Sequence, residues 1–383
     1  MKKYLQYFLL VFLISCTTDA LTDLPEKQSG ETEIKRVIYM IGDGMGMNHV
    51  ELLRLEQNRD ELIFDKASGK GKITTFSANN KITDSAAAGT ALACGQKTNN
   101  AMIGITPDGT PLASLLKLSK SYGWKTGIIV TCYLTHATPA AFYANSQSRD
   151  YDEVITRQLL KADIDVLVGG GINNSKDPAF LDTVRNVFSR EDYLFTNDPS
   201  GLKNRYGKKT ALSMTDRGFL PPVINGRDPG LMSSVTQDVL NNFGDDPFFL
   251  MIEGSQIDTQ SHGNNIAGVI EEVADFERIA RVCFDYADSH PGTLVVITAD
   301  HETGGLTLPD QNSDKKLPAS GIPYSFSTDY HTDAMVPVYA YGTRSQLFNG
   351  EYDNTVLFDK LKSLLSEKQN VTKQAETTVV HTD

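Results

Sequence analysis

The sequence predicts an α/β fold, with a doubly wound, mostly parallel central sheet and helices on both of its faces. Apolar, β-rich runs recur along the 383 residues, and most are apolar on both faces, as strands buried inside a parallel sheet are. Between the runs lie segments whose apolar residues are spaced three and four apart, which is the helical period. This alternation of strand and helix is typical of a doubly wound sheet.

The predicted elements follow one another without internal repeats. Strands are expected at 37–41, 71–76, 126–130, 166–168, 248–252, 294–298 and 336–340, and helices at 86–94, 112–120, 152–161, 232–242 and 266–287. The less regular segment 173–227 is expected to form a surface insertion. Residues 308–330, rich in Pro, Ser, Asp and Lys, are expected to form a loop excursion, and the polar tail 363–383 is expected to fray.

The N-terminus has the features of a targeting segment. A basic start is followed by an apolar run at 4–14 that is too short to span a bilayer, so 1–15 is predicted to be a cleaved signal. The run ends in Leu-Ile-Ser-Cys16, which resembles the lipobox of bacterial lipoproteins; a plain secretory signal that contains Cys16 by chance is the alternative. Residues 16–35 then form a flexible tether. We expect an exported protein, either periplasmic or lipid-anchored through Cys16 in the outer membrane of a Gram-negative bacterium.

Charge and cysteine content restrict the class of protein further. The net charge of −12 argues against nucleic acid as a partner and suits a protein that gathers divalent cations. Cys94, Cys132 and Cys283 show no CxxC spacing and are predicted to be small buried hydrophobes. The pattern leaves open a disulfide between two of them in an oxidising compartment.

Acidic residues and histidines gather in the turns that follow the predicted strands. Ligands of open α/β sheets bind beyond the carboxyl ends of the strands, so these side chains are expected to share one edge of the sheet. They are Asp43, His136, Glu253, Asp258, His262, Asp300 and His301, with His331 just before the last strand. His49, His290 and His381 lie outside these turns and are expected to be ordinary core or surface residues.

The residue types in these turns favour a clustered metal site. Asp258 and His262 are four apart, on one face of a helix, although such pairs also arise by chance. The pair Asp300-His301 directly follows a buried strand, where a charged pair is costly unless it is bonded to something. Histidines with carboxylates suit zinc and a harder ion such as magnesium, and we expect no sulfur-type zinc site because these turns lack cysteine. Two zinc ions would clamp the attacking and leaving oxygens of an in-line displacement.

Ser85 stands at the first turn of the small-residue helix at 86–94. Free N–H groups and the helix dipole favour an anion there. Alone, Asp84-Ser85 is an ordinary N-cap; beside a metal site, Ser85 becomes a nucleophile that a metal ion activates without a neighbouring base. Arg149 fits a bidentate phosphate clamp in this setting and a solvated surface arginine without it.

Together these motifs resemble the alkaline phosphatase family. The matching segments are 41–46, 83–87, 136–140 with Arg149, 253–258 with His262, 299–305 and 331–332, in the family's order across 36–362. The resemblance implies a catalytic domain over 36–362 that hydrolyses small phosphate monoesters at alkaline pH, with broad specificity and inorganic phosphate as product. It also implies a homodimer with two zinc ions and one magnesium ion per subunit.

The resemblance implies a role for each matching residue. The first zinc would be held by Asp258, His262 and His331, the second by Asp43, Asp300 and His301 with Ser85, and magnesium by Asp43, Thr138 and Glu253. Ser85 would form a phosphoserine, and Arg149 would bind phosphoryl oxygens. Asp84 and His136 would lie next to these groups without binding a metal ion directly.

The chain departs from other members of the family at three points. His136 stands where the best-known bacterial form carries an aspartate and the animal forms a histidine. This residue predicts looser magnesium, with zinc as an alternative occupant. Thr259 stands where other members carry Lys, His or Trp near the phosphate. The short link between His301 and His331 predicts a reduced crown.

Other functions fit parts of the pattern. A phosphomutase would need a larger inserted domain, and a sulfatase would need a motif such as C-x-P-x-R, which Ser85 does not lie in. Arg149 and the serine nucleophile weigh against a phosphodiesterase. A surface protein that only sequesters zinc or phosphate would not need the Ser85 hydroxyl.

Overall fold

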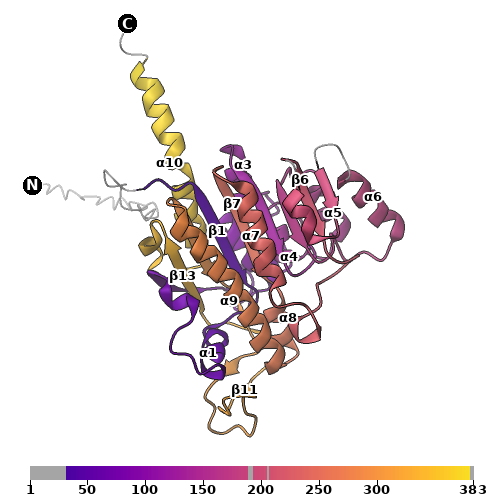
Figure 1. Cartoon of the computed structure of the whole chain (residues 1–383), viewed down its shortest axis with the longest axis vertical. Helices are drawn as coiled ribbons and strands as arrows, with labels where there is room; N and C mark the ends of the chain where they lie inside the picture. The colour runs from indigo at the N-terminus through magenta and orange to yellow at the C-terminus, as the bar shows by residue number, and fades with distance from the viewer. Residues whose placement is uncertain (1–31, 189–192, 205–206, 380–383) are drawn as a thin grey trace, which may run out of the picture. The chain divides into compact units, whose positions relative to one another are not determined.

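The computed structural model describes residues 32–188, 193–204 and 207–379. Within these residues the central sheet has ten strands, in the order β14-β2-β13-β8-β1-β7-β3-β4-β6-β5. Neighbouring strands are parallel except at β13 (Val336–Gly342), which runs antiparallel to both β2 (Gly69–Thr74) and β8 (Thr293–Thr298). Figure 1 shows β1, β7 and β13 among the strands of this sheet. The predicted mostly parallel α/β sheet is confirmed.

The centre of the sheet is buried on both faces, as its apolar runs predict. In β1 (Arg36–Gly42), β7 (Phe248–Gly254) and β8 every residue is buried, and in β3 (Lys125–Val130) only the first is partly exposed. β4 (Val166–Gly169) is likewise buried. These strands end at one edge of the sheet because they are parallel, and that edge holds the polar turns.

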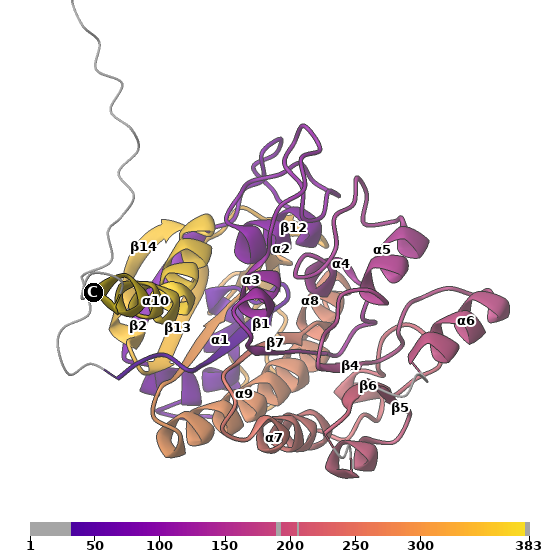
Figure 2. The same cartoon turned by 90° about the horizontal axis from the view of Figure 1, so that it is seen from above.

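Helices cover both faces of the sheet. On one face α9 (Ile266–Ser289) packs against β8, β13, β1 and β7, with α7 (Leu231–Phe243) and α1 (Met47–Glu56) beside it. On the other, α3 (Leu115–Ser121) packs against β3 and β7 and contacts α2 (Ser85–Cys94) and α10 (Thr355–Val379). Figure 2 shows the two layers on opposite sides of the strands. The sheet is therefore doubly wound.

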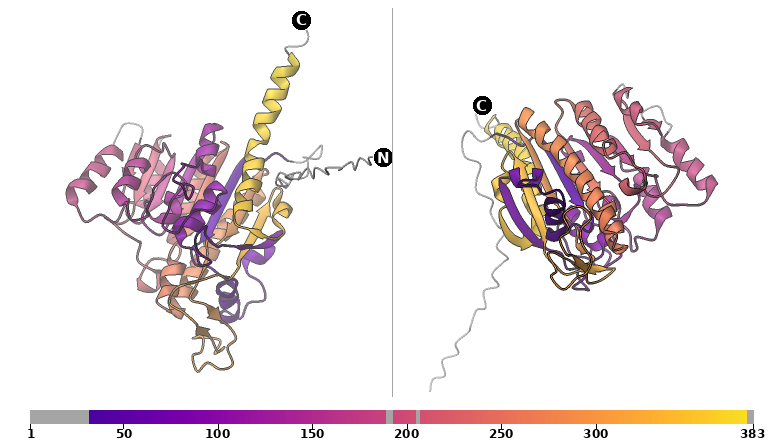
Figure 3. Two further views of the ribbon diagram at one scale, coloured as in Figure 1. Left: turned by 180° about the vertical axis from the view of Figure 1, so that it is seen from behind. Right: turned by 60° about the horizontal axis from the view of Figure 1, so that its bottom comes forward.

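The remaining elements are short. They are α4 (Ala137–Ala140), α5 (Asp152–Leu159), α6 (Pro178–Phe188), α8 (Gln256–His262), β9 (Glu302–Thr303), β10 (Leu306–Thr307), β11 (Ser325–Phe326), β12 (His331–Thr332) and β14 (Gly350–Asp353). β9 pairs with β12, and β10 pairs with β11 at the base of the excursion 308–330, which projects from the body as a loop (Figure 3).

Two segments differ from their sequence-based predictions. The segment 173–227 is not only a surface insertion, because β5 (Tyr193–Thr196) and β6 (Lys209–Ser213) extend the central sheet beyond β4. These strands are short and flanked by polar residues, which hides their periodicity. The tail does not fray at 363: α10 continues to Val379, through Glu, Lys, Gln and Ala residues that favour helix.

The predicted signal at 1–15, Cys16, residues 16–31 of the tether and His381 lie outside the described residues. Among the residues that are described, none of the helices combines the length and the apolar character that crossing a membrane requires. The three cysteines Cys94, Cys132 and Cys283 are buried free thiols, so the reading of them as buried small residues is confirmed and no disulfide joins them.

Candidate metal and phosphate site

The edge formed by the carboxyl ends of the parallel strands brings the predicted site residues together. Asp43 follows β1, and Asp300 follows β8. Glu253 is the last residue but one of β7 and pairs with Ile41 of β1 and Val130 of β3. A glycine is required at position 44, where φ is +76° and a Cβ would lie 2.9 Å from the Cα of Asp258. This close approach places α8, which carries Asp258 and His262, against the turn after β1.

Ser85 is the first residue of α2, and its position follows from local packing. Asp84 is the N-cap, with extended backbone (φ −109°, ψ 169°), and its side chain accepts a hydrogen bond from the Ala87 N–H at 3.0 Å. Small residues let α2 pack closely on α4: a Cβ on Gly89 would lie 3.4 Å from the Cα of Thr138. The helix start therefore holds a buried Ser85 hydroxyl beside the strand ends.

Asp258, His262 and His331 form the first group of potential ligands. One ligand atom from each lies within 4.8 Å of the others. The Nδ1–H of His331 donates to the Thr83 carbonyl at 2.8 Å, and the Nδ1–H of His262 donates to the Asp329 carbonyl at 2.6 Å. A carbonyl only accepts, so both Nε2 atoms, 3.2 Å apart, are turned toward Asp258. Such backbone bonds behind the ring are typical of histidines that bind a metal.

Asp43, Asp300 and His301 form the second group, which also meets the 4.8 Å limit. His301 Nε2 lies 3.6 Å from Asp43 Oδ1, 3.2 Å from Asp300 Oδ2 and 3.2 Å from Ser85 Oγ. The Thr303 hydroxyl donates to Asp258 at 2.6 Å and so accepts from His301 Nδ1–H at 3.2 Å. Because His301 Nδ1 carries the proton in this series of hydrogen bonds, His301 Nε2 is the acceptor that faces Ser85.

The third predicted set, Asp43, Thr138 and Glu253, lies deepest. All three residues are buried, and Thr138 Oγ1 and Glu253 Oε1 have no hydrogen-bond partner among the described residues. The other Glu253 oxygen, Oε2, accepts from the Cys132 thiol at 3.3 Å. Cys132 also groups with Glu253 and His136 within the 4.8 Å limit, so the expectation that these turns contain no cysteine is wrong.

Arg149 reaches the start of α2 from a loop. One guanidinium nitrogen donates to Asp84 at 3.3 Å, and the other lies 3.2 Å from His136 Nε2. The same Asp84 oxygen, Oδ2, also accepts from the Ala101 N–H at 2.9 Å. Arg149 is thus held beside Ser85 and is not a free surface residue, while Thr259 lies exposed on α8 between Asp258 and His262.

The site carries more negative charge than its own residues neutralise. Burial and then the charge of Asp300 raise the pKa of Glu253 to about 8, and burial and Asp300 raise that of Asp43 well above its usual range. Both Asp43 oxygens and Asp300 Oδ2 lack hydrogen-bond partners among the described residues. A buried carboxylate without a partner is costly, so this donor set fits divalent cations. The hydrogen bond to Asp258 raises the pKa of His262 to about 9.

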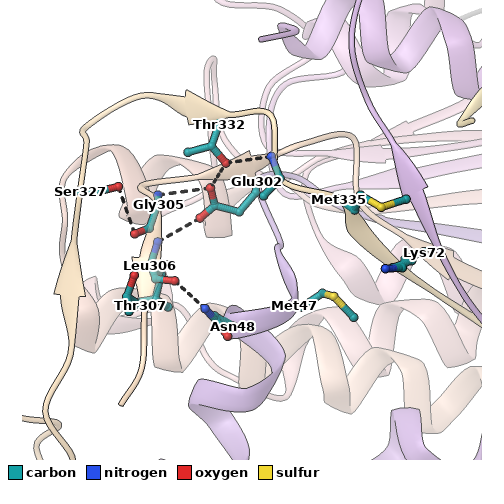
Figure 4. Close-up of a pocket in the computed structure, with 11 residues that line it drawn as sticks. Met47, Asn48, Lys72, Glu302, Gly305, Leu306, Thr307, Ser327, Thr332 and Met335 are labelled. Atoms are coloured by element: carbon teal, nitrogen blue, oxygen red, sulfur yellow. Dashed lines mark hydrogen bonds between the residues drawn. The ribbon is translucent and has the colours of Figure 1, made fainter. Parts of the chain in front are cut away.

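Glu302 follows His301 but belongs to a different feature. Its carboxylate accepts from the Gly305 N–H at 3.2 Å, the Leu306 N–H at 3.1 Å and the Thr332 hydroxyl, which leaves it no part in holding a metal. Beside it lies a cavity of about 560 Å³ that Met47 and Met335 also line (Figure 4). None of the twelve predicted site residues lines this cavity, so it is separate from the site.

Sequence reasoning missed several groups that orient the site. Thr303 stands in the 299–305 motif and could have been singled out, because its hydroxyl links Asp258 to His301. The carbonyls of Thr83 and Asp329 act through the backbone, which leaves no signal in the residue type. Buried His49, hydrogen-bonded to Ser261 Oγ at 3.0 Å, lies outside the site, as predicted.

The chain is similar to known phosphatases over most of its length. The family model described as alkaline phosphatase matches residues 34–320. Alkaline phosphatase 3 of Bacillus subtilis (strain 168) is 30% identical, over 86% of this chain and 88% of that protein. Streptomycin-6-phosphate phosphatase of Streptomyces griseus is 27% identical, over 92% of this chain and 95% of that protein.

A solved structure agrees with these likenesses. The alkaline phosphatase of the Antarctic bacterium TAB5 has a TM-score of 0.79 and 32% identity, over 88% of this chain and 99% of that chain. A TAB5 variant in which a histidine is replaced by glutamate is described with Mg bound in the M3 site, at a TM-score of 0.78 and 31% identity, over 88% of this chain and 99% of that chain.

Proposed function

Since the chain belongs to the alkaline phosphatase family and is a metal-dependent phosphatase of phosphate monoesters, we propose that Ser85 is its nucleophile and passes through a phosphoserine. One observation carries the proposal: the Ser85 hydroxyl lies 3.2 Å from His301 Nε2, where two groups of potential ligands meet. A buried serine at this junction is oriented for attack on phosphorus and needs no separate base.

We propose that three divalent ions bind per subunit. Asp258, His262 and His331 would hold one zinc, and Asp43, Asp300 and His301 the other. Asp43, Thr138 and Glu253 would hold magnesium or zinc. When bound, the ions would supply the positive charge that lowers the pKa of the Ser85 hydroxyl and neutralises the phosphoryl oxygens. The unpartnered carboxylate oxygens support this assignment.

The chain's own residues would bind and orient the phosphoryl group. Arg149 offers two parallel N–H donors, and Asp84 fixes the position of the guanidinium. The first N–H groups of α2 and the positive end of its dipole face the same place. Because these contacts grip only phosphoryl oxygens, and because Thr259 adds neither charge nor bulk, we expect broad specificity among phosphate monoesters.

We further propose that the protein is exported, anchored in the outer membrane through a lipid on Cys16, and homodimeric. The basic start, the apolar run 4–14 and the lipobox-like sequence support export and lipidation. The likeness to the family supports the dimer.

Hydrolysis of a chromogenic aryl phosphate at pH 8–10, with and without a chelator, tests the proposed function. Exhaustive chelation should abolish turnover, and added zinc plus magnesium should restore it. Full activity after chelation would overturn the metal assignment. Turnover of an aryl phosphodiester above that of the monoester would favour a diesterase instead.

A further inference from the structure

Cys132 stands in the turn after β3, at the deepest part of the site. Its side chain is fully buried, and its Sγ lies 3.3 Å from Glu253 Oε2. Its backbone N–H donates to Ser255 Oγ at 3.1 Å, while the Ser255 N–H donates to Thr131 Oγ1 at 2.9 Å. These bonds fix the turn that carries the thiol, and the thiol itself donates to Glu253 Oε2.

The sulfur shares its surroundings with oxygens that lack partners. Glu253 Oε1, Thr138 Oγ1 and both oxygens of Asp43 are buried without a hydrogen bond among the described residues. Ligand atoms of Cys132, Glu253 and His136 lie within 4.8 Å of one another. Glu253 belongs both to this group and to the predicted set Asp43, Thr138 and Glu253, so the thiol borders the buried oxygens that lack hydrogen bonds.

His136 contributes less to this cluster than its residue type suggests. The guanidinium of Arg149 can only donate, so His136 Nε2 accepts from it at 3.2 Å and the ring proton of the neutral imidazole sits on Nδ1. Neither ring nitrogen then offers a free lone pair, and sulfur is the soft donor that remains.

We propose that Cys132 is a sulfur ligand of the third ion and that this site holds zinc, not magnesium. This inference rests on the proposed function, because it assigns a ligand to one of the sites proposed above. Magnesium takes oxygen ligands, whereas zinc binds cysteine sulfur at about 2.3 Å. Coordination replaces the S–H bond by an S–Zn bond, and the proton passes to solvent as binding releases it.

The competing role for Cys132 is purely structural. A neutral thiol that donates to Glu253 would hold the carboxylate in place without touching the ion. A serine at position 132 would preserve that hydrogen bond but not the soft ligand, so Cys132→Ser separates the two roles. Cys132→Ala removes both.

Cobalt substitution tests the proposal directly. Zinc in the purified protein is exchanged for Co²⁺, and the near-ultraviolet spectrum is recorded. A sulfur-to-cobalt charge-transfer band is expected in the wild-type protein and in the matched controls Cys94→Ala and Cys283→Ala, since those buried thiols lie outside the site. The band should vanish in Cys132→Ser and persist in His136→Gln. A wild-type protein without the band, or a Cys132→Ser protein that keeps it, overturns the proposal.

Two further measurements test the proposal, and the first uses the wild-type protein alone. X-ray absorption of the zinc-loaded wild type should detect about one sulfur neighbour near 2.3 Å for every three zinc ions. Metal analysis after dialysis against mixed zinc and magnesium should find zinc in all three sites, whereas Cys132→Ser should bind the third zinc about tenfold more weakly or worse. Oxygen and nitrogen neighbours alone would overturn the proposal. If the sulfur signal is missing but a chelator still abolishes turnover, the Cys132 proposal fails and the proposed function holds. If turnover continues after chelation, the proposed function itself fails, whatever the spectrum shows.

Discussion

The orientation of the reacting groups rests on a chain of directed hydrogen bonds. Asp258 accepts from the Thr303 hydroxyl, which accepts from His301 Nδ1–H, so His301 presents its Nε2 lone pair to Ser85. Each direction follows from what the partner atom can do. In the proposed function Thr303 is therefore a positioning residue, which acts through Asp258 and His301.

Replacing Thr303 should weaken metal binding before it affects anything else. In Thr303→Val the shape is kept but the link between Asp258 and His301 is lost, so zinc affinity should fall about 10–100-fold. Competition with a coloured chelator measures this without recourse to activity. Thr307→Val, at an exposed position nearby, serves as the control. Unchanged affinity in Thr303→Val would show that the ions orient these groups unaided.

Arg149 should matter for phosphate and not for metal. Loss of its charge-assisted donors in Arg149→Ala should weaken inhibition by inorganic phosphate about 10–100-fold, equivalent to roughly 1.5–3 kcal/mol. Arg149→Lys keeps the charge but not the planar pair of donors, so its affinity for inorganic phosphate should lie between those of the wild type and Arg149→Ala. Metal analysis is the control, and lost zinc in Arg149→Ala would contradict the assigned position.

Most of the site could be predicted from residue types at strand ends. Asp43, Asp300 and His301 are titratable residues just beyond buried strands, Glu253 is the last residue but one of β7, and Asp258 lies on the helix that follows β7. Charged residues at the ends of buried strands are unusual enough to be informative. Thr303 and Cys132 were not recognised because a threonine in a motif and a cysteine after a strand have ordinary structural roles. Only the distances from Thr303 to Asp258 and from Cys132 to Glu253 reveal what they do.

At the scale of elements, the start of α2 combines a stability role with a functional one. Asp84 caps the helix through the Ala87 N–H, binds the Ala101 N–H and anchors Arg149. The sequence shows the cap but not the anchor, because Ala101 and Arg149 reach it from loops distant in the chain.

Asp84→Ala should therefore lower both stability and phosphate affinity. Loss of the cap costs about 1–2 kcal/mol, and the unpaired Ala101 N–H adds to this, so Tm should fall by a few degrees. Arg149 loses its anchor, and inhibition by phosphate should weaken. In Asp84→Asn the amide oxygen can still cap the helix, so Tm should fall less. Equal losses of Tm in the two variants would contradict the cap.

The edge of the sheet beyond β4 shows where element prediction fails. The central strands were predicted because burial on both faces makes them continuously apolar. β5 is only partly buried along its length, and β6 is a short strand flanked by polar residues. Neither strand therefore shows a clear hydrophobic periodicity in the sequence. Their place in the sheet depends on contacts with β4 and not on local sequence.

At the scale of the whole molecule, the fold gathers buried carboxyl groups whose ionised forms are costly without bound cations. In the ion-free folded protein Glu253 keeps its proton to about pH 8 and His262 to about pH 9. In the unfolded chain both lose it by about pH 6.5. The folded state thus binds more protons between these values, and the stability of the ion-free protein should fall as pH rises from about 6.5 to 9.

Thermal unfolding across this range, with and without ions, measures the effect. The Tm of the chelated protein should fall steadily as pH rises toward 9. The Tm of the protein loaded with zinc and magnesium should not fall in this way, because bound ions keep the ligands deprotonated. Glu253→Gln should flatten the slope of the chelated protein. Parallel slopes with and without ions would mean that these residues do not form the ion sites.

The central claim is that Ser85 becomes covalently phosphorylated during turnover. Acid quenching of the enzyme during hydrolysis of an aryl phosphate, followed by peptide mass spectrometry, tests it most directly. We expect one added phosphoryl group on the peptide that contains Ser85 and none on the corresponding peptide of Ser85→Ala. The turnover of Ser85→Ala should fall about a thousandfold or more while its zinc content stays the same. A phosphoryl group on another residue, or normal turnover by Ser85→Ala, would contradict it.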